Sequence, residues 1–215
     1  MRLLAILVGV FYVYACGIVL VACAGCRREE SHATNPIDKA IEKVIGGTVL
    51  IKGNTAYVPP LSPEVAQLVA AGRQDVPYML EKMQSPDLRI RTYVAYAMGE
   101  IGDARSAEPL IGLVEEMRTS RHGPEEWRRG VRYESMKALS KIKSPLISAY
   151  ALRKVLSMNA RDLVVEGAWY AHILKAQGVE ADIKLAIDSL RVRRQKNGPN
   201  ANVDAMIRML TEGDN

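Results

Sequence analysis

The sequence predicts an all-α solenoid of about four to five helix pairs, with a short β-hairpin near the N-terminus. The first observation is the run of residues 88–101, in which apolar side chains recur at helical spacing. Gly102 then favours a left-handed helix end, and Asp103 can cap the element that follows. The stripe at positions i, i+4, i+7, i+8 and i+11 consists of Ile90, Val94, Ala97, Met98 and Ile101.

The second observation is that this pattern returns 41 residues later. A fixed offset is typical of stacked repeat units, each of which buries one apolar face against its neighbours. Two positions correspond weakly, since Ser135 lies beneath Val94 and Ser140 beneath Gly99. A third copy falls near residues 163–177, in a register that the sequence leaves ambiguous. The good matches place Val131, Arg132, Ala138, Leu139 and Ile142 beneath Ile90, Arg91, Ala97, Met98 and Ile101.

The start of the helix that follows each of these segments also returns, because residues 109–111 and 145–147 both read Pro-Leu-Ile. With these features residues 76–114 resemble the HEAT repeat family, and most closely its phycobilisome-lyase-like subtype. Residues 133–147 resemble the same repeat more weakly. The resemblance covers roughly residues 62–178, and its degenerate end reaches toward residue 212. It implies a stack of paired helices but says little about function, because each unit mainly buries its stripe against the next.

The composition fits a packed helical core with a modest positive charge. The 215 residues are 48% hydrophobic and carry a formal net charge of +5. Acidic residues are interspersed with the basic ones, whereas a nucleic-acid binder usually gathers Lys and Arg into a stripe. The one dense basic run is residues 191–196, where we expect a solvated helix end rather than a phosphate or lipid-headgroup site. No nucleic-acid partner is therefore expected.

The N-terminal segment predicts that the protein is located in the cell envelope. Residues 3–24 carry no charge and follow Arg2, which is typical of a signal peptide or a spanning helix. Residues 20–23 read Leu-Val-Ala-Cys and resemble the lipobox of bacterial lipoproteins. That resemblance implies removal of residues 1–22 as a lipoprotein signal peptide and attachment of acyl chains such as palmitate at Cys23. Several such chains together anchor a protein stably in a membrane.

Two alternatives stay open at this end of the chain. Cys26 follows the small residues Ala24 and Gly25 and is the alternative lipidation site. An uncleaved transmembrane anchor is the other, because about twenty apolar residues suffice to span a bilayer. A redox or zinc CxxC site is not expected, since Cys16 lies inside the apolar run and no ligand pair follows. Neither Cys23 nor Cys26 precedes Asp, which in a Gram-negative cell predicts an outer-membrane lipoprotein facing the periplasm.

The residues between the anchor and the repeats predict a tether and two small elements. Residues 23–36, which begin with the lipidated Cys, are mostly polar and predict a flexible tether. Residues 37–44 predict a short helix, and residues 48–52 and 55–58 predict two strands around a Gly53-Asn54 turn. Because an isolated hairpin is marginally stable, we expect it to pack on the first helices of the domain.

The repeat domain is predicted over residues 61–212, after the short helix and hairpin of residues 37–60. It begins at Ser62-Pro63-Glu64, which combines a hydroxyl cap with Pro and an acid in the first turn. Breaks rich in Gly, Pro and Asn separate the helices, and the long connection of residues 118–126 is either a contact loop or a tolerated insertion. The predicted helices span residues 65–71, 76–83, 88–101, 107–117, 127–142, 146–158, 163–176, 182–194 and 203–210.

No motif for catalysis, cofactor binding or metal binding occurs in the sequence. His32, His122 and His172 have no Cys or paired acid at ligand spacing. The zincin, nucleophile-elbow, P-loop and dinucleotide-binding patterns are missing. The adjacent acids Glu115 and Glu116 diverge on a helix, so we expect solvated surface rather than a catalytic pair. The sequence therefore predicts a protein that is not an enzyme, with no cofactor, no metal and no small-molecule substrate.

The second helices of the repeats carry the candidate contact residues. In HEAT-like solenoids the second helix of each pair generally lines the concave side, and the resemblance implies the same here. Tyr, Trp and Arg are the side chains most enriched in binding hot spots. For the aromatic residues the alternative is packing between neighbouring helices. The expected partner-binding residues are Arg89, Tyr93, Tyr96, Glu100, Arg132, Lys137 and Trp169, together with Lys141 and Tyr170.

These expectations describe a scaffold or adaptor that binds a protein partner in the cell envelope. The HEAT subtype is named for enzymes that attach or detach bilin chromophores, so the resemblance also implies an alternative, a bilin or tetrapyrrole lyase-like protein. The export signal argues against that alternative, because bilin attachment is a cytoplasmic or plastid process in that family. A third hypothesis is a membrane-surface or nucleic-acid binder acting through residues 191–196, which requires steeply salt-dependent binding.

Overall fold

The computed structural model describes residues 35–47, 50–51, 54–55, 62–159 and 162–212. Apart from residue 35, all of them belong to a unit that spans Pro36–Asn215. The predicted signal peptide, both lipidation candidates Cys23 and Cys26, and all but the last two residues of the tether lie outside the described residues. None of the helices formed by the described residues is long and apolar enough to cross a membrane.

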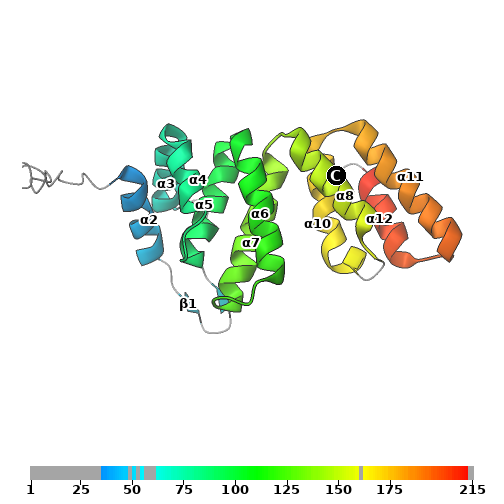
Figure 1. Cartoon of the computed structure of the whole chain (residues 1–215), viewed down its shortest axis with the longest axis horizontal. Helices are drawn as coiled ribbons and strands as arrows, with labels where there is room; N and C mark the ends of the chain where they lie inside the picture. The colour runs from blue at the N-terminus through cyan, green and yellow to red at the C-terminus, as the bar shows by residue number, and fades with distance from the viewer. Residues whose placement is uncertain (1–34, 48–49, 52–53, 56–61, 160–161, 213–215) are drawn as a thin grey trace, which may run out of the picture. The chain divides into compact units, whose positions relative to one another are not determined.

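The described part of the chain is almost entirely helical, and the repeat-domain helices begin and end within three residues of their predicted bounds, except at the start of the helix predicted over residues 163–176. Two short non-α turns accompany them, η1 (Ala104–Ser106) and the π-helical η2 (Leu163–Gly167). Figure 1 shows the helices in chain order. They are α2 (Pro36–Gly46), α3 (Pro63–Gln74), α4 (Val76–Lys82), α5 (Leu88–Ile101), α6 (Ala107–Thr119), α7 (Glu125–Lys141), α8 (Pro145–Ser157), α10 (Ala168–Gln177), α11 (Glu180–Asn197) and α12 (Ala201–Thr211).

Local sequence determines where these helices begin and end. Ser62 caps α3 as predicted, because its side-chain oxygen accepts a hydrogen bond from the backbone N–H of Val65. Asp87 caps α5 in the same way through the N–H of Arg89. Gly102 ends α5 with φ = 77°, a left-handed conformation that glycine adopts without the steric cost of a Cβ. The caps therefore fix the boundaries that the apolar periodicity alone leaves open.

The helices pack as the predicted α-solenoid. Consecutive helices pair as α2 with α3, α4 with α5, α6 with α7, α8 with α10, and α11 with α12. The second helices of these pairs also contact one another in order, from α3 through α5, α7 and α10 to α12. Each apolar stripe is thus buried against a partner helix and against the next repeat, which is the arrangement that stabilises a solenoid.

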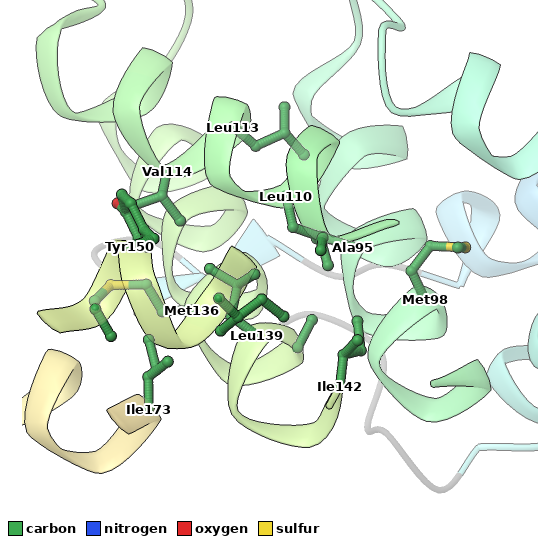
Figure 2. Close-up of a cluster of buried hydrophobic side chains, with 14 of the residues drawn as sticks. Ala95, Met98, Leu110, Leu113, Val114, Met136, Leu139, Ile142, Tyr150 and Ile173 are labelled. Carbon is green, nitrogen blue, oxygen red and sulfur yellow. The ribbon is translucent and has the colours of Figure 1, made fainter. Parts of the chain in front are cut away.

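The core between the central repeats is built from aliphatic and sulfur-containing side chains (Figure 2). Five elements contribute to it, and Tyr150 on α8 brings an aromatic ring into the same cluster. Full burial of one such side chain contributes about 1.5–3 kcal/mol, so a continuous cluster outweighs any single polar contact. The labelled residues are Ala95, Met98, Leu110, Leu113, Val114, Met136, Leu139, Ile142, Tyr150 and Ile173, all buried.

The two weak correspondences of the repeat differ in residue type rather than in position. Val94 and Ser135 are both completely buried, so the register of the 41-residue offset is kept. Gly99 has a steric role, because a Cβ built on it would lie 2.8 Å from Ala138 Cα across the interface between α5 and α7. Ser140, the counterpart of Gly99, is only half-buried, and its hydroxyl donates to the Lys137 carbonyl at 2.8 Å.

The start of the predicted helix 163–176 differs from the expectation. The first turn is the π-helical η2, and a regular α-helix begins only at Ala168. Gly167 lies at the end of this turn, and a Cβ built on it would lie 2.2 Å from the Met206 side chain. Close packing of α12 against η2 therefore accompanies the wider turn, and the apolar periodicity of the sequence gave no indication of either.

The predicted hairpin is not supported beyond a minimal strand pair. Residues 50–51 (β1) and 54–55 (β2) pair antiparallel, with Leu50 opposite Thr55 and Ile51 opposite Asn54. Asn54 therefore belongs to a strand and not to the predicted Gly53-Asn54 turn. The remaining residues of the predicted strands lie outside the described residues. β2 contacts α7, which lies further along the chain than the first helices on which we expected the hairpin to pack.

Candidate functional site

The 41-residue offset places equivalent residues of α5 and α7 side by side. Tyr96 corresponds to Lys137 and Glu100 corresponds to Lys141. Lys137 Nζ and Lys141 Nζ each lie 5.5 Å from the centroid of the Tyr96 ring, within the range of a cation–π interaction. Lys141 also forms an ion pair with Glu100. The structure thus brings four of the predicted contact residues into one cluster, namely Tyr96, Glu100, Lys137 and Lys141.

The surroundings shift the pKa values of Glu100 and Tyr96 in opposite directions. The hydrogen bond from Lys141 holds the pKa of Glu100 below its ordinary value, although burial opposes this. Burial, together with the nearby negative charge of Glu100, raises the pKa of Tyr96 to about 12. At neutral pH Tyr96 is therefore a neutral ring between two ammonium groups, and Glu100 is a carboxylate.

A second group of side chains joins α7 to η2 and α10. The rings of Tyr133 and Trp169 meet edge to face, with centroids 5.2 Å apart and planes at 86°. Arg132 Nη2 lies 2.6 Å from Glu166 Oε1. Burial is the largest single influence on Arg132 and lowers its pKa, but the hydrogen bond to Glu166, the charge of Glu166 and the nearby Tyr170 together raise the pKa above its ordinary value. Two further predicted contact residues, Arg132 and Trp169, therefore lie on neighbouring elements beside each other.

A hollow of about 190 Å³ lies within this second group. Its lining is mostly apolar, and Met136, which is only 3% exposed, forms its inner wall. A hollow of this size fits one amino-acid side chain rather than a drug-sized ligand, whose pockets are about 300–1,000 Å³. The lining residues are Arg129, Arg132, Tyr133, Met136, Glu166 and Trp169.

Both groups belong to one surface, which we call the α7 face. Its central row is Arg129, Tyr133, Lys137 and Lys141, which follow each other at i+4 spacing and so share one side of α7. The first group flanks this row on the side of α5, and the second flanks it on the side of α10. The α7 face comprises Tyr96, Glu100, Arg129, Arg132, Tyr133, Met136, Lys137, Lys141, Glu166 and Trp169.

Three predicted contact residues do not belong to this face. Tyr93 is 3% exposed and Tyr170 is completely buried, so both are core residues and not parts of a surface ridge. Tyr93 is buried because α5 packs against α3 and α4 as well as α7, so its apolar surface is wider than one stripe. Arg89 is exposed, but it pairs at 2.6 Å with Asp87, the cap of its own helix.

Sequence reasoning missed four residues of the face, Arg129, Tyr133, Met136 and Glu166. Tyr133 lies at the position of Thr92 in the previous repeat, so the 41-residue offset indicated no aromatic side chain there. Glu166 belongs to η2, where the register of the third copy was ambiguous. The i+4 row along α7 was the signal available in the sequence, and it contains Arg129 and Tyr133.

The adjacent acids Glu115 and Glu116 diverge as expected, but Glu115 is not plain solvated surface. Tyr150 donates a hydrogen bond to Glu115 Oε1 at 2.6 Å, and Lys154 Nζ lies 2.6 Å from the same atom. Glu116 points to α5 and pairs with Arg91 at 2.8 Å. The two carboxylates therefore tie α6 to α8 and to α5, and they do not converge on one point.

The basic run of residues 191–196 is largely engaged in contacts within the fold. Arg193 donates to two backbone carbonyls at the end of α8, including Leu156 O at 2.6 Å. Arg194 Nε lies 2.9 Å from Asp204 Oδ1 on α12. Arg191 approaches Asp188 at 3.5 Å within α11. The three arginines thus act as helix-capping and interhelical cations more than as an open anionic-ligand site.

The connection between α6 and α7 is held against the body of the fold. Arg128 of α7 donates to the carbonyl of Ser120, and the His122 N–H donates to Ser120 Oγ at 3.2 Å. Gly123 has φ = 77°, and a Cβ built there would lie 2.8 Å from the Leu88 side chain of α5. Such local contacts suit an insertion that is tolerated by the repeat.

No group of three or more His, Cys, Asp or Glu side chains arranged to hold a metal ion occurs within the described ranges. The residues of the α7 face offer aromatic rings, guanidinium and ammonium groups, and two paired carboxylates. Such a surface can bind through apolar contact, cation–π interaction and charge.

The family model described as PBS lyase HEAT-like repeat matches residues 90–116 of the chain. These residues include most of α5, the turn η1 and most of α6. Comparison with curated proteins and comparison with solved structures give no match. The match supports the HEAT-like nature of the central repeat, and it is compatible both with a repeat scaffold and with a protein of the PBS lyase type.

Proposed function

We propose that this HEAT-like helical repeat protein is a non-enzymatic scaffold or adaptor that binds a protein partner through the α7 face. The observation that carries the proposal is the assembly of aromatic and cationic side chains from α5, α7 and α10 on one surface. Tyr, Trp and Arg are the residues that most often dominate binding energy at protein interfaces. HEAT-like repeats generally mediate protein interactions, which agrees with this use of the surface.

The charges of the face favour a protein surface over a nucleic acid or a bare membrane. Lys141 is paired with Glu100, and Arg132 is paired with Glu166. A polyanion is normally bound by a run of cations that are available to release its counterions. On this face two of the four cations are already paired with carboxylates, which suits a partner that also presents both apolar and polar side chains.

A membrane anchor at the N-terminus completes the proposal. The lipobox-like residues 20–23 support lipidation at Cys23, with Cys26 as the alternative, and hence an extracytoplasmic position in the cell envelope. In a Gram-negative cell the expected position is the outer membrane, facing the periplasm. The test is the double substitution Cys23→Ala with Cys26→Ala, which we expect to abolish lipid labelling and leave an unprocessed precursor. Undiminished lipid labelling of the double variant would contradict the anchor.

The binding proposal is tested by purifying the tagged full-length protein from its native membrane in a mild detergent. We expect a stoichiometric protein partner with the wild type and its loss with Tyr96→Ala combined with Trp169→Ala. The matched control combines Leu185→Ala with Val192→Ala on α11, where both side chains are more than half exposed, at 52% and 56%. Loss of the partner in the control but not in the face variant would move the site away from α7.

The alternative function is a bilin or tetrapyrrole lyase-like activity, which the match to the PBS lyase HEAT-like repeat favours. Under this alternative the protein purified from its native source carries visible absorbance or binds an added tetrapyrrole. The hollow of the α7 face, about 190 Å³, is smaller than most pockets for ligands of drug size, which favours a protein partner over a tetrapyrrole at this face. If the purified protein shows visible absorbance and Trp169→Ala abolishes it, the lyase-like function would be favoured over the scaffold.

A further inference from the structure

Of the two cations that line the hollow of the α7 face, one has no partner among the residues that the structure describes. Arg132 is held by Glu166, with 2.6 Å between Nη2 and Oε1. Arg129, three residues earlier, lies at the solvent-exposed edge of the hollow. Across the ranges that the structure describes, Arg129 makes no ion pair and no side-chain hydrogen bond. The local charge balance is therefore positive by one guanidinium.

We infer that the hollow binds an acidic segment of the partner protein, with one apolar side chain inserted and a neighbouring carboxylate paired with Arg129. This inference rests on the proposed function, because it names the chemistry of the partner at the same face. It goes further by predicting what a binding segment must contain.

The apolar part of the inference follows from the walls of the hollow. Tyr133 is 43% exposed although it is a large aromatic residue, and its ring meets Trp169 edge to face. Met136 closes the inner end, and an unbranched thioether adapts to side chains of different shape. Exposed aromatic surface around a hollow of one side-chain volume is typical of a hot-spot pocket.

The charged part follows from Arg129. A guanidinium presents its donors in a planar fork that matches a carboxylate with two parallel hydrogen bonds. Because Glu166 is already neutralised by Arg132, it does not compensate Arg129. A carboxylate that arrives beside the inserted side chain therefore gains a partner without displacing an existing ion pair. A basic segment would instead meet Arg129 with like charge.

The other cations of the face lie beside carboxylates of the fold, which favours an acidic protein segment over a polyanion as the ligand. Lys141 is occupied by Glu100, and Lys137 lies 4.0 Å from the buried Glu134. A single unpaired guanidinium beside an apolar hollow fits one carboxylate and one apolar side chain. A phosphate backbone or an anionic bilayer needs several available cations.

The test uses the full-length protein in mild detergent and a random peptide library displayed on phage. Segments enriched on the wild type are synthesised, and their affinities are compared among four proteins: wild type, Arg129→Glu, Trp169→Ala and the control Arg191→Glu. Arg191 is exposed on α11, away from the face, and undergoes the same charge reversal. Far-UV circular dichroism checks that each variant is folded. Vesicles of phosphatidylcholine with phosphatidylglycerol serve as the anionic-membrane probe.

We expect enriched segments that combine an apolar residue with Asp or Glu, and affinities that fall by about tenfold or more with Arg129→Glu, the loss of roughly one charge-assisted contact. Arg191→Glu should leave them unchanged. Segments without acids that still depend on Trp169 would overturn the acidic chemistry and leave the proposed function intact. Segments indifferent to both face variants, or no enriched segment at all, would overturn the inference. Vesicle binding that depends on Arg129 would overturn it in favour of a membrane surface.

Discussion

Lys141 on α7 forms an ion pair with Glu100 on α5, and the two residues occupy equivalent positions of consecutive repeats, 41 residues apart. Tyr96 and Lys137 have the same relationship, with the ammonium 5.5 Å from the ring centroid. In both cases the sequence offset sets two different side chains opposite each other across the interface. Divergence between repeats at these positions therefore produces the contacts, since identical charges at both would repel.

This ion pair predicts a pH dependence of stability. In the folded protein Lys141 lowers the pKa of Glu100 from the ordinary value of 4.5. Its contribution is thus present above about pH 4.5 and is lost as the pH falls through the folded-state pKa. Both side chains are about one-third exposed, so we expect about 0.5 kcal/mol. Denaturant unfolding of wild type and Lys141→Gln at several pH values measures it, and identical pH profiles for the two proteins would contradict the prediction.

The close approach of α5 and α7 predicts an unusual response to Gly99→Ala. In an open helix position this change stabilises by up to about 1 kcal/mol. Here the added Cβ would lie 2.8 Å from Ala138 Cα and 2.9 Å from Ala138 Cβ, which forces the helices apart. We expect a net loss of about 1–2 kcal/mol in the free energy of unfolding, typical of overpacking.

The matched control is Gly112→Ala on α6, where a Cβ would meet nothing within 4 Å. Thermal unfolding should show a higher Tm for this control and a lower Tm for Gly99→Ala. Equal shifts in the same direction would mean that the α5–α7 interface tolerates the methyl group.

The buried hydroxyl of Tyr150 predicts a stability loss on Tyr150→Phe. The hydroxyl donates to Glu115 Oε1 at 2.6 Å and lies 3.3 Å from Tyr170 Oη. Burial and the hydrogen bond to Glu115 raise the pKa of Tyr150, so the phenol stays protonated and keeps donating. Losing this hydrogen bond should cost about 1–2 kcal/mol. The control Tyr133→Phe alters an exposed ring and should change stability by less than about 0.5 kcal/mol; a larger effect there than at Tyr150 would refute the assignment.

The basic run predicts different roles for two nearby arginines. Arg193 satisfies the last carbonyls of α8, so Arg193→Ala should destabilise the fold by about 1–2 kcal/mol. Arg191 is exposed and only approaches Asp188, so Arg191→Ala should change stability by less than about 0.5 kcal/mol. Urea unfolding of both variants compares them directly. If Arg193→Ala leaves stability unchanged but weakens binding to anionic vesicles, residues 191–196 form a membrane-binding site instead.

The sequence was sufficient for α5 because this helix carries two independent signals. The stripe of Ile90, Val94 and Met98 predicted the period of α5, and Gly102 predicted its C-terminal end. The offset gave the stacking of α5 on α7, because a repeat must bury equivalent faces. Both kinds of information are local or periodic, and neither requires knowledge of distant contacts.

The candidate site was only partly predictable, because exposure depends on how many neighbours a helix has. Tyr93 was predicted as a surface contact residue, yet it is buried by the packing around α5. The pairing of Arg132 with Glu166 depends on the π-helical turn η2, which shifts the register of the following helix. The hollow beside Arg129 is lined by side chains of α7, η2 and α10, so it became visible only with the packed structure.

The most direct test of the α7 face is site-specific photocrosslinking in the native membrane. A photoreactive amino acid replaces Tyr133 in one protein and Leu185 in another; both positions are exposed, at 43% and 52%. The proposed scaffold predicts one discrete protein adduct from position 133 and none from position 185. An adduct formed only from position 185, or the same adducts from both positions, would contradict partner binding through the α7 face.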